Sequence, residues 1–305
     1  MKNPRSVNGL LLLDKPSGIS SNTALQTIKT IFQAQKAGHT GSLDPLASGM
    51  LPICLGEATK FSQFLLTSDK IYRVTAKLGI QTTTGDKEGE IIQEQAVPSF
   101  GIDRINQLLT SFTGKQTQVP SMYSALKYKG QPLYKLARQG IEVERPERPI
   151  EIHYIHLLNH AADEFTFEVK SSKGTYIRTL VEDMGIALGC GAHITALRRI
   201  NAAHFQEDQM QTLAFFENLR GNLTKLDSQL LPIDQVITQL PELQISEAAF
   251  YYLSQGQPII YPYEAPTEGQ VKLMRKGEQG GFLGIGKVLA DGRIAPERML
   301  HGVKN

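Results

Sequence analysis

The chain has 305 residues, of which 41% are hydrophobic and 20% charged, and its formal net charge is +2 at pH 7. This length allows one large domain or two unequal ones, and the composition is close to that of an ordinary soluble globular protein. No apolar run reaches the roughly 18 residues of a membrane-spanning helix, and the first run, residues 10–13, ends at Asp14. We therefore expect a cytoplasmic protein with neither a signal peptide nor a membrane span.

Positive charge is concentrated in two separate stretches. Residues 115–148 carry seven Lys or Arg against three acidic residues, and residues 270–305 carry the same numbers. Residues 201–245 carry two against six. The two basic stretches could both contact a polyanion such as RNA, and the alternative is ordinary solvated surface charge.

The cysteines and histidines do not favour a metal site. Cys54 and Cys190 are far apart in sequence and form no Cys-x-x-Cys pair, so we predict two buried thiols. His153, His156 and His160 lie close together, but the apolar residues between them fit a strand and its turn better than one helical face. We expect no metal and no cofactor, because phosphate-binding and dinucleotide-binding glycine motifs are also missing.

The first predicted elements are a strand, a helix and a glycine-rich loop. Residues 9–13 should form a buried strand, and a helix should follow because residues 20–22 offer N-caps before apolar residues at helical spacing. Residues 38–56 contain four glycines and two prolines, with a short buried strand expected near their end. A helix is predicted over about residues 57–66.

Asp44 is the only carboxylate in the glycine-rich loop. It precedes Pro45, which keeps the Asp44 backbone out of the helical region. Local rules favour a turn in which the carboxylate accepts a hydrogen bond from a nearby backbone N–H. Rigid elements that flank a polar loop are, however, also where catalytic side chains tend to be placed. The residues around Asp44 alone leave both interpretations open.

The middle of the chain alternates predicted strands with polar turns. Period-two alternation predicts a strand at 71–78, with Tyr72 at the end of its core-facing row, where an ordinary buried tyrosine is the simplest interpretation. A polar turn at 82–90 and a helix at 103–112 follow. The basic stretch 115–148 should then form a hairpin tip and a short helix. Its tyrosines alternate with lysines, a mixture suited to RNA, although a merely soluble hairpin would look similar.

Two strands are predicted at about 149–158 and 164–171, and a helix then runs from Tyr176 to a stop at Gly189. Arg178 lies off the buried stripe of this helix, in the first turn, where a cation is slightly unfavourable. Its position suggests a specific partner, and a solvated arginine is the alternative. A strand at 192–200 and an acidic stretch precede residue 240, after which prolines and glycines between short apolar runs predict a small β-barrel.

Five segments in order along the chain resemble the TruB family of bacterial tRNA pseudouridine synthases. The first, residues 38–49, resembles the family's catalytic-aspartate motif. The others are Tyr72–Val74, Pro120–Lys127, Ser172–Leu180 and Leu197–Arg199. Because the matches are collinear over most of the chain, the resemblance is highly specific.

The resemblance implies an α+β fold, in which a mixed, mainly antiparallel central sheet is flanked by helices. It implies a catalytic domain over residues 1–238, with the basic stretch 115–148 as an RNA-contacting insertion. Residues 239–305 would form a small PUA-like RNA-binding β-barrel. The implied reaction isomerises the uridine at position 55, in the T-stem loop of tRNA, to pseudouridine without a cofactor. We expect a monomer with no obligatory protein partner.

The resemblance also assigns roles to individual residues. Asp44 would be the nucleophile, attacking either C1′ of the ribose or C6 of the base, and Arg178 would keep it ionised in a water-poor pocket. Tyr72 would be a catalytic residue that stacks on the extruded uracil, and its hydroxyl could also assist proton transfer at C5. Tyr176 and Leu197 are expected to line the pocket. His39 would fill the space that the base leaves, and Lys15 would be structural or close to the RNA.

Two other functions agree less well with the sequence. A non-catalytic tRNA-binding or tRNA-folding protein could use the same scaffold, but such a protein would be expected to have lost one of the residues Asp44, Tyr72, Arg178 and Leu197, which are all present. An aspartate-based glycosidase usually needs two carboxylates at a defined spacing, and the matching motifs hold no second acid.

Overall fold

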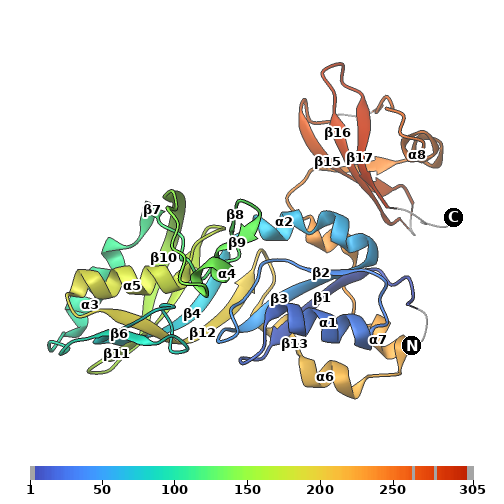
Figure 1. Ribbon diagram of the computed structural model, residues 1–305. Helices are drawn as coiled ribbons and strands as arrows, with labels where there is room; N and C mark the ends of the chain where they lie inside the picture. Colours follow the sequence, from blue (N-terminus) through green and yellow to red (C-terminus); the bar gives the residue numbers. More distant parts are fainter. Residues whose placement is uncertain (1–3, 263–264, 278–279, 301–305) are drawn as a thin grey trace.

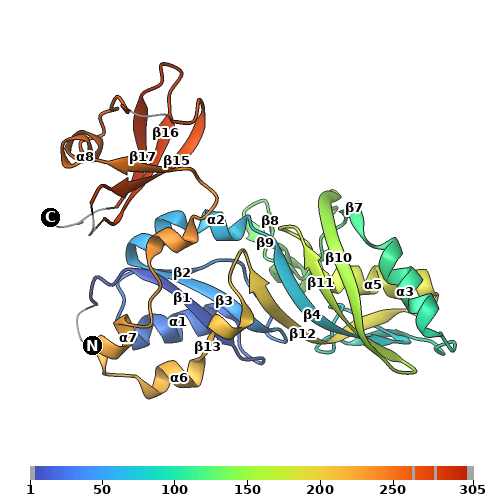
Figure 2. The same ribbon diagram turned by 180° about the vertical axis from the view of Figure 1, so that it is seen from behind.

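The computed structural model describes residues 4–262, 265–277 and 280–300. It is an α+β fold with a nine-stranded sheet and, after residue 241, a separate four-stranded sheet (Figures 1 and 2). The strands of the large sheet are β1 (Gly9–Lys15), β2 (Ala37–His39), β3 (Ser48–Leu55), β4 (Lys70–Leu78), β7 (Gly114–Gln118), β10 (Arg148–His160), β11 (Glu164–Ser171), β12 (Ala192–Ala202) and β13 (Gln211–Thr212). The fold class expected from the sequence is confirmed.

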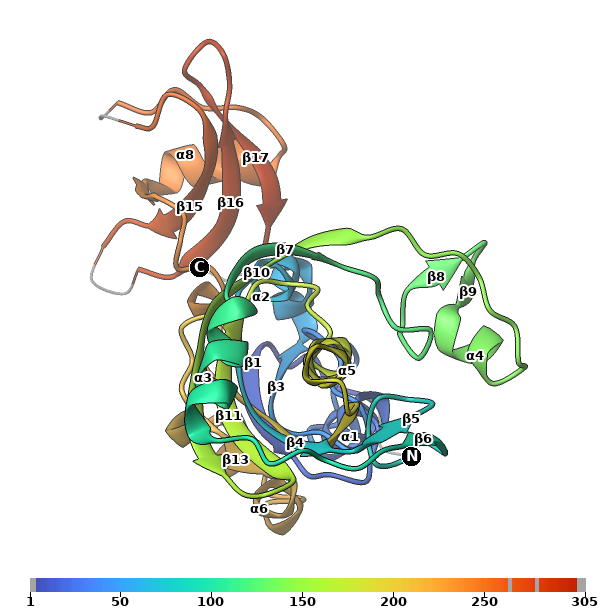
Figure 3. The same cartoon turned by 90° about the vertical axis from the view of Figure 1, so that its left-hand side faces the viewer.

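The large sheet is mixed but mainly antiparallel. Its strand order is β13-β1-β3-β12-β4-β11-β10-β7, with β2 paired to β3, and the parallel pairs are β1 with β13 and β3 with β12. The helices packed around it are α1 (Ser21–Ile31), α2 (Gln63–Leu66), α3 (Ile102–Ser111), α5 (Ile177–Leu188), α6 (Leu213–Asn218) and α7 (Leu223–Asp227), with 3₁₀ helices η1 (Gly56–Phe61), η2 (Glu207–Gln209) and η3 (Ile233–Val236). Figure 3 shows α5 on the concave side of the curved sheet.

Strand β1 buries side chains on both of its faces. Leu11 and Leu13 join the main core with α1 and α5, whereas Leu10 and Leu12 pack on the opposite face with Phe61 of η1. Because successive strand residues point to opposite faces, a continuous apolar run such as Leu10–Leu13 is what a strand covered on both sides requires. The two buried cysteines, Cys54 and Cys190, are free thiols, as predicted.

Before residue 100, two details differ from the sequence-based prediction. Residues 57–66 form η1 followed by the short helix α2 rather than one α-helix, because Thr59 and Ser62 hydroxyls bond carbonyls three residues earlier and compete with the regular helical pattern. The polar turn 82–90 is flanked by an unpredicted hairpin, β5 (Ile80–Thr82) and β6 (Ile91–Glu94). All four β6 side chains are exposed, so the sequence shows no alternation there.

The basic insertion projects from the body of the molecule in Figure 3. It contains β8 (Lys127–Tyr128), β9 (Gln131–Pro132) and α4 (Leu133–Ala137), close to the hairpin tip and short helix that were predicted. A small core of its own holds it together, formed by Met122, Leu133 and Leu136.

The C-terminal sheet is formed by β14 (Glu242–Ile245), β15 (Gly269–Arg275), β16 (Phe282–Val288) and β17 (Ile294–Met299), in that order, beside α8 (Glu247–Ser254). Its described strands form an open path rather than a closed barrel. Phe282 packs edge-on against Phe61 at a centroid distance of 5.1 Å, so this sheet shares a core with η1. Residues 278–279 and 301–305 of the second basic stretch lie outside the described residues.

None of the described helices combines the length and apolar character that crossing a membrane would require.

Candidate active site

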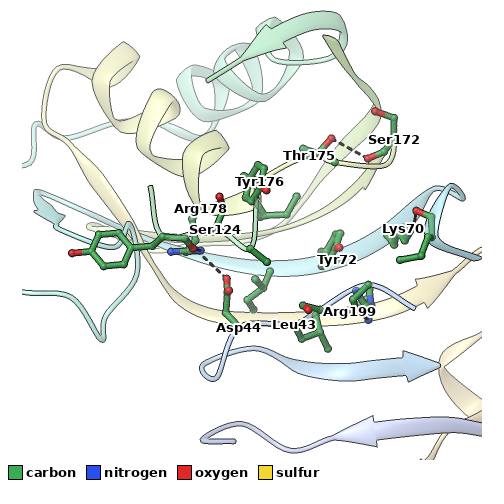
Figure 4. Close-up of a pocket in the computed structure, with 18 residues that line it drawn as sticks. Leu43, Asp44, Lys70, Tyr72, Ser124, Ser172, Thr175, Tyr176, Arg178 and Arg199 are labelled. Carbon is green, nitrogen blue, oxygen red and sulfur yellow. Dashed lines mark hydrogen bonds and ion pairs between the residues drawn. The ribbon is translucent and has the colours of Figure 1, made fainter. Parts of the chain in front are cut away.

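A pocket of about 340 Å³ lies between the loop after β2, the start of β4, the beginning of the basic insertion and the N-terminus of α5. Five of the predicted site residues line it: Asp44, Tyr72, Tyr176, Arg178 and Leu197. They come from four separate regions of the sequence, and Figure 4 shows their side chains around the cavity, Leu197 among the unlabelled sticks. Lys15 and His39 are not among the lining residues.

The loop that carries Asp44 is fixed on both sides of the carboxylate. Ser21, at the start of α1, accepts a hydrogen bond from the Leu43 N–H at 2.7 Å and donates one to the Leu43 carbonyl at 2.9 Å. On the other side, Gly18 donates its N–H to the Pro45 carbonyl at 2.8 Å. Leu43 and Leu46 are buried, which leaves Asp44 directed into the pocket with 40% of its side chain exposed.

Arg178 is the partner of Asp44. Its Nε lies 2.9 Å from Asp44 Oδ2, Nη1 donates to the Thr84 carbonyl at 2.6 Å, and Nη2 donates to the Tyr123 carbonyl at 2.7 Å. Only 6% of this side chain is exposed, so the solvated alternative is wrong. Asp86 lies 3.8 Å from Nη1 and adds a second carboxylate beside the guanidinium.

Opposing effects act on the pKa of Asp44. Burial in the pocket raises this pKa, the neighbouring Arg178 charge and hydrogen bond lower it, and the nearby Asp86 raises it again, with a net increase. The ionised carboxylate therefore depends on the guanidinium for much of its stabilisation. A planar donor group with three fixed partners suits this task better than a flexible ammonium group.

Aromatic and aliphatic side chains form the walls. Gln118 holds the Tyr176 backbone by accepting from its N–H at 2.8 Å and donating to its carbonyl at 3.1 Å. Leu197 is 8% exposed and comes from β12, where it lies opposite Val74 of the neighbouring strand β4. The Tyr72 hydroxyl bonds no described residue, unlike that of an ordinary buried tyrosine. Aromatic and aliphatic walls thus flank the Asp44–Arg178 ion pair.

Lys15 and His39 lie beside the loop rather than in the pocket. Lys15 is fully buried, and its Nζ donates to the carbonyls of Pro16 and Ile19 at 2.8 Å and approaches that of Pro45 at 3.5 Å. Burial lowers the pKa of Lys15 to about 8. His39 is half-buried on β2, and its buried Nδ1 has no hydrogen-bond partner among the described residues.

Three charged residues in or beside the pocket were not predicted as site residues: Asp86, Lys70 and Arg199. Asp86 accepts from the Thr84 hydroxyl at 2.6 Å and from the Glu88 N–H at 3.1 Å, which fixes the 82–90 turn against Arg178. Lys70 and Arg199 line the pocket and are buried. Arg199 belongs to one of the matching segments and could have been found there, whereas Lys70 has no signal in the sequence.

Sequence comparisons assign most of the chain to one group of proteins. Residues 29–177 match the model of the "TruB family pseudouridylate synthase (N terminal domain)". Residues 178–238 match the "tRNA pseudouridylate synthase B C-terminal domain", and residues 241–300 match "Pseudouridine synthase II TruB, C-terminal".

Individual relatives agree with these family models. The chain is 53% identical over 299 residues to tRNA pseudouridine synthase B of Coxiella burnetii, covering 97% of this chain and 96% of that one. It is 48% identical over 304 residues to the protein of the same name from Yersinia pestis, covering 97% and 93%. Among solved structures, a chain of a Cbf5–Nop10–Gar1 complex superimposes with a TM-score of 0.73 at 25% identity, covering 95% of this chain and 84% of that one.

Proposed function

The chain belongs to the TruB family of pseudouridylate synthases, and on that premise we propose that Asp44 is the group with which it converts a uridine of tRNA to pseudouridine. The activity itself, isomerisation of uridine in tRNA, follows from membership of the family. The observation that carries the assignment of Asp44 is its ion pair with Arg178, in which Asp44 Oδ2 lies 2.9 Å from Arg178 Nε. The pair lies at the wall of the pocket, where the carboxylate is partly exposed.

The chemistry requires little more than a placed carboxylate. The N1–C1′ bond of the uridine must break, the uracil must turn while it is held, and C5 must then bond to C1′ and lose its proton while N1 gains one. No electrons enter or leave overall, so one nucleophile that attacks either C1′ or C6 is enough to begin the sequence. Arg178 supports the ionised form of Asp44 that such an attack needs. Which carbon is attacked stays open.

The pocket walls suit a uracil. About 340 Å³ is within the range of small-molecule pockets, and Tyr72 and Leu197 offer apolar surfaces against which a flat base can stack and from which water is excluded. A base in folded RNA is stacked on its neighbours and must first be flipped out. We propose that His39 fills the space it leaves, and that Lys15 acts indirectly by fixing the loop on which Asp44 sits.

The target is proposed to be the uridine at position 55 in the T-stem loop, contacted also by the basic insertion at residues 115–148. We further propose that the enzyme acts in the cytoplasm as a monomer, without an obligatory protein partner, metal or cofactor. Light scattering of the purified protein would test the monomer, because a dimer would have twice the 33.7 kDa mass of the chain.

The Asp44→Asn variant tests the assignment. It is nearly isosteric but cannot act as a nucleophile, so we expect no pseudouridine from a transcribed T-stem loop, mapped by carbodiimide reactivity, while binding of the RNA is retained. Asp163→Asn is the matched control, because Asp163 is a surface carboxylate paired with Lys77, and it should remain active.

The same assay in EDTA tests the metal-free reaction. Product formed by the wild-type enzyme without EDTA but not with it would contradict this part of the proposal. An Asp44→Asn variant that still forms pseudouridine would overturn the assignment of the nucleophile. Loss of RNA binding together with activity would indicate that the substitution had disrupted the structure of the loop and had not only removed the carboxylate.

A further inference from the structure

The pocket has a second charged end, which the Asp44 chemistry does not use. Lys70 and Arg199 line it, and Figure 4 shows both beyond Tyr72 as seen from Asp44. Lys70 is 6% exposed and Arg199 1%. Neither forms an ion pair with any carboxylate in the described part of the chain. Buried cations are normally paired, because removing a charge from water is costly unless another charge compensates it.

Lys70 is held by backbone oxygens alone. Its Nζ donates to the carbonyls of Leu65 and Leu66 at 3.0 Å and to that of Ser68 at 2.5 Å, at the C-terminal end of α2. These dipoles orient the ammonium group but do not neutralise it. The neighbouring Asp69 carboxylate is directed to His153, 3.0 Å away. Burial and the nearby Arg199 charge lower the pKa of Lys70 to about 8.

The Arg199 guanidinium is hydrogen-bonded to the protein on one side only. Its Nε donates to the Met50 carbonyl at 2.6 Å and its Nη2 to the Gly41 carbonyl at 3.1 Å, both in or next to the loop that carries Asp44. Its Nη1 donates to no described residue. The guanidinium therefore keeps hydrogen-bond donors for a ligand, and the Ser172 hydroxyl, which accepts from the Glu151 N–H at 2.8 Å, lies at the same end of the pocket.

We propose that Lys70 and Arg199 form a phosphate subsite, which binds one phosphodiester of the RNA backbone next to the target uridine. The inference rests on the proposed function. A uridine whose ribose reaches Asp44 must bring its covalently attached phosphates with it. Those anions would be repelled by the Asp44 carboxylate, and two uncompensated cations at the far end of the pocket offset that repulsion. The subsite thereby fixes the ribose relative to Asp44, with Arg199 donating hydrogen bonds and Lys70 supplying charge.

Chemically modified RNA tests this contact. A methylphosphonate removes the charge of a single phosphate, so T-stem loops are made with this group either 5′ or 3′ of the target uridine. Equilibrium binding is measured in an Asp44→Asn background, for Arg199→Lys, for Lys70→Met and for the parent. We expect each substitution to weaken binding of natural RNA about tenfold. RNA with one of the two methylphosphonates should bind the parent protein about as weakly as natural RNA binds the variants. When this modified RNA is bound by either variant, the affinity should fall little further.

Lys173→Met is the matched control. Lys173 is an exposed cation between Ser172 and Gly174, which both line the pocket, so its loss should weaken binding of natural and modified RNA by the same factor. If the loss of affinity caused by Arg199→Lys or Lys70→Met also multiplies with the loss caused by each methylphosphonate, the substitution and the modification act independently. The two residues are then structural, and the phosphate subsite is overturned.

A second measurement does not rely on substitutions. In the parent protein, NMR of the Lys70 side chain should show its pKa rising from about 8 when RNA binds, because a phosphate would stabilise the ammonium form. An unchanged or lowered pKa would contradict the proposal. Both measurements require binding only, so they remain informative even if the catalytic role of Asp44 is disproved.

Discussion

At the scale of single residues, the site depends on one guanidinium that serves three partners. Arg178 pairs with the Asp44 carboxylate through Nε, and its Nη1 and Nη2 donate hydrogen bonds to the carbonyls of Thr84 and Tyr123. These carbonyls belong to the 82–90 turn and to the basic insertion. The arginine therefore opposes the increase that burial causes in the pKa of Asp44, and it also joins three segments that are distant in sequence.

The pH dependence of the reaction follows from this pair. The pKa of Asp44 is raised in the folded protein, and the reactive form is the carboxylate, so kcat/KM should fall as the pH is lowered through that pKa. Arg178→Met removes the group that lowers the pKa of Asp44, so the acid limb should move to higher pH. Arg178→Lys, which keeps the charge but loses the planar fork, should move it less while lowering kcat at least about tenfold. An acid limb at the same pH in all three proteins would show that Asp44 is not the titrating group.

At the scale of elements, the pocket floor depends on a close approach of β3 to β12. Gly49 lies opposite Arg199 in this parallel pair and has a φ of +98°. A Cβ at Gly49 would lie 2.2 Å from the Arg199 carbonyl oxygen, which no real contact permits. The loop that carries Asp44 and the strand that carries Leu197 and Arg199 can meet only because a glycine occupies this position.

Gly49→Ala should therefore lower the free energy of unfolding by about 3 kcal/mol or more, as the strain of a positive φ adds to the clash with the backbone. Gly221→Ala separates the two effects, because Gly221 has a similar φ of +90° but nothing within 4 Å of an added Cβ. It should cost only about 1 kcal/mol. Denaturant unfolding of the two variants checks the difference, and equal losses would mean that the strands separate to accept the methyl group.

Local patterns predicted much of this architecture. The N-cap at Ser20, the alternation in β4 and the stop at Gly189, which adopts a φ of +79°, are short-range signals that the structure confirms. The partners of Arg178 could not be predicted in this way, since Thr84 and Tyr123 lie 94 and 55 residues from it. Local rules likewise left Asp44 undecided between a turn and a catalyst, and only the motif resemblance favoured the second. Lys70 was missed because its carbonyl partners are defined by the fold and not by side-chain type.

At the scale of the whole molecule, the two sheets are joined through η1. Phe61 contributes to the core that Phe282 of β16 enters, Lys60 Nζ donates to the Met299 carbonyl at 3.1 Å, and Arg298 Nη1 donates to the Lys60 carbonyl at 2.5 Å. The same segment continues into α2, whose last carbonyls hold Lys70 in the pocket. The C-terminal sheet is thus connected to the pocket by packed residues. The boundary near residue 238 between a catalytic and a PUA-like domain stays a prediction.

Neighbouring residues of β16 can test this connection. Phe282 faces the shared core, whereas Leu283 faces the core of the C-terminal sheet itself. Phe282→Ala should cost about 3 kcal/mol and speed amide hydrogen exchange in residues 56–68 by about a hundredfold. Leu283→Ala should act mainly on exchange within β14–β17. If both variants affect residues 56–68 equally, η1 does not depend on the contact with Phe282.

The aromatic contact between η1 and β16 has a consequence for substrate choice. A flexible tether would let the C-terminal sheet follow an RNA of almost any shape, but a shared core holds the two parts at one separation and one angle. An RNA that touches both parts must match that spacing before its uridine can reach Asp44. Any RNA contact on the C-terminal sheet would therefore lie at a fixed distance from the uridine in the pocket.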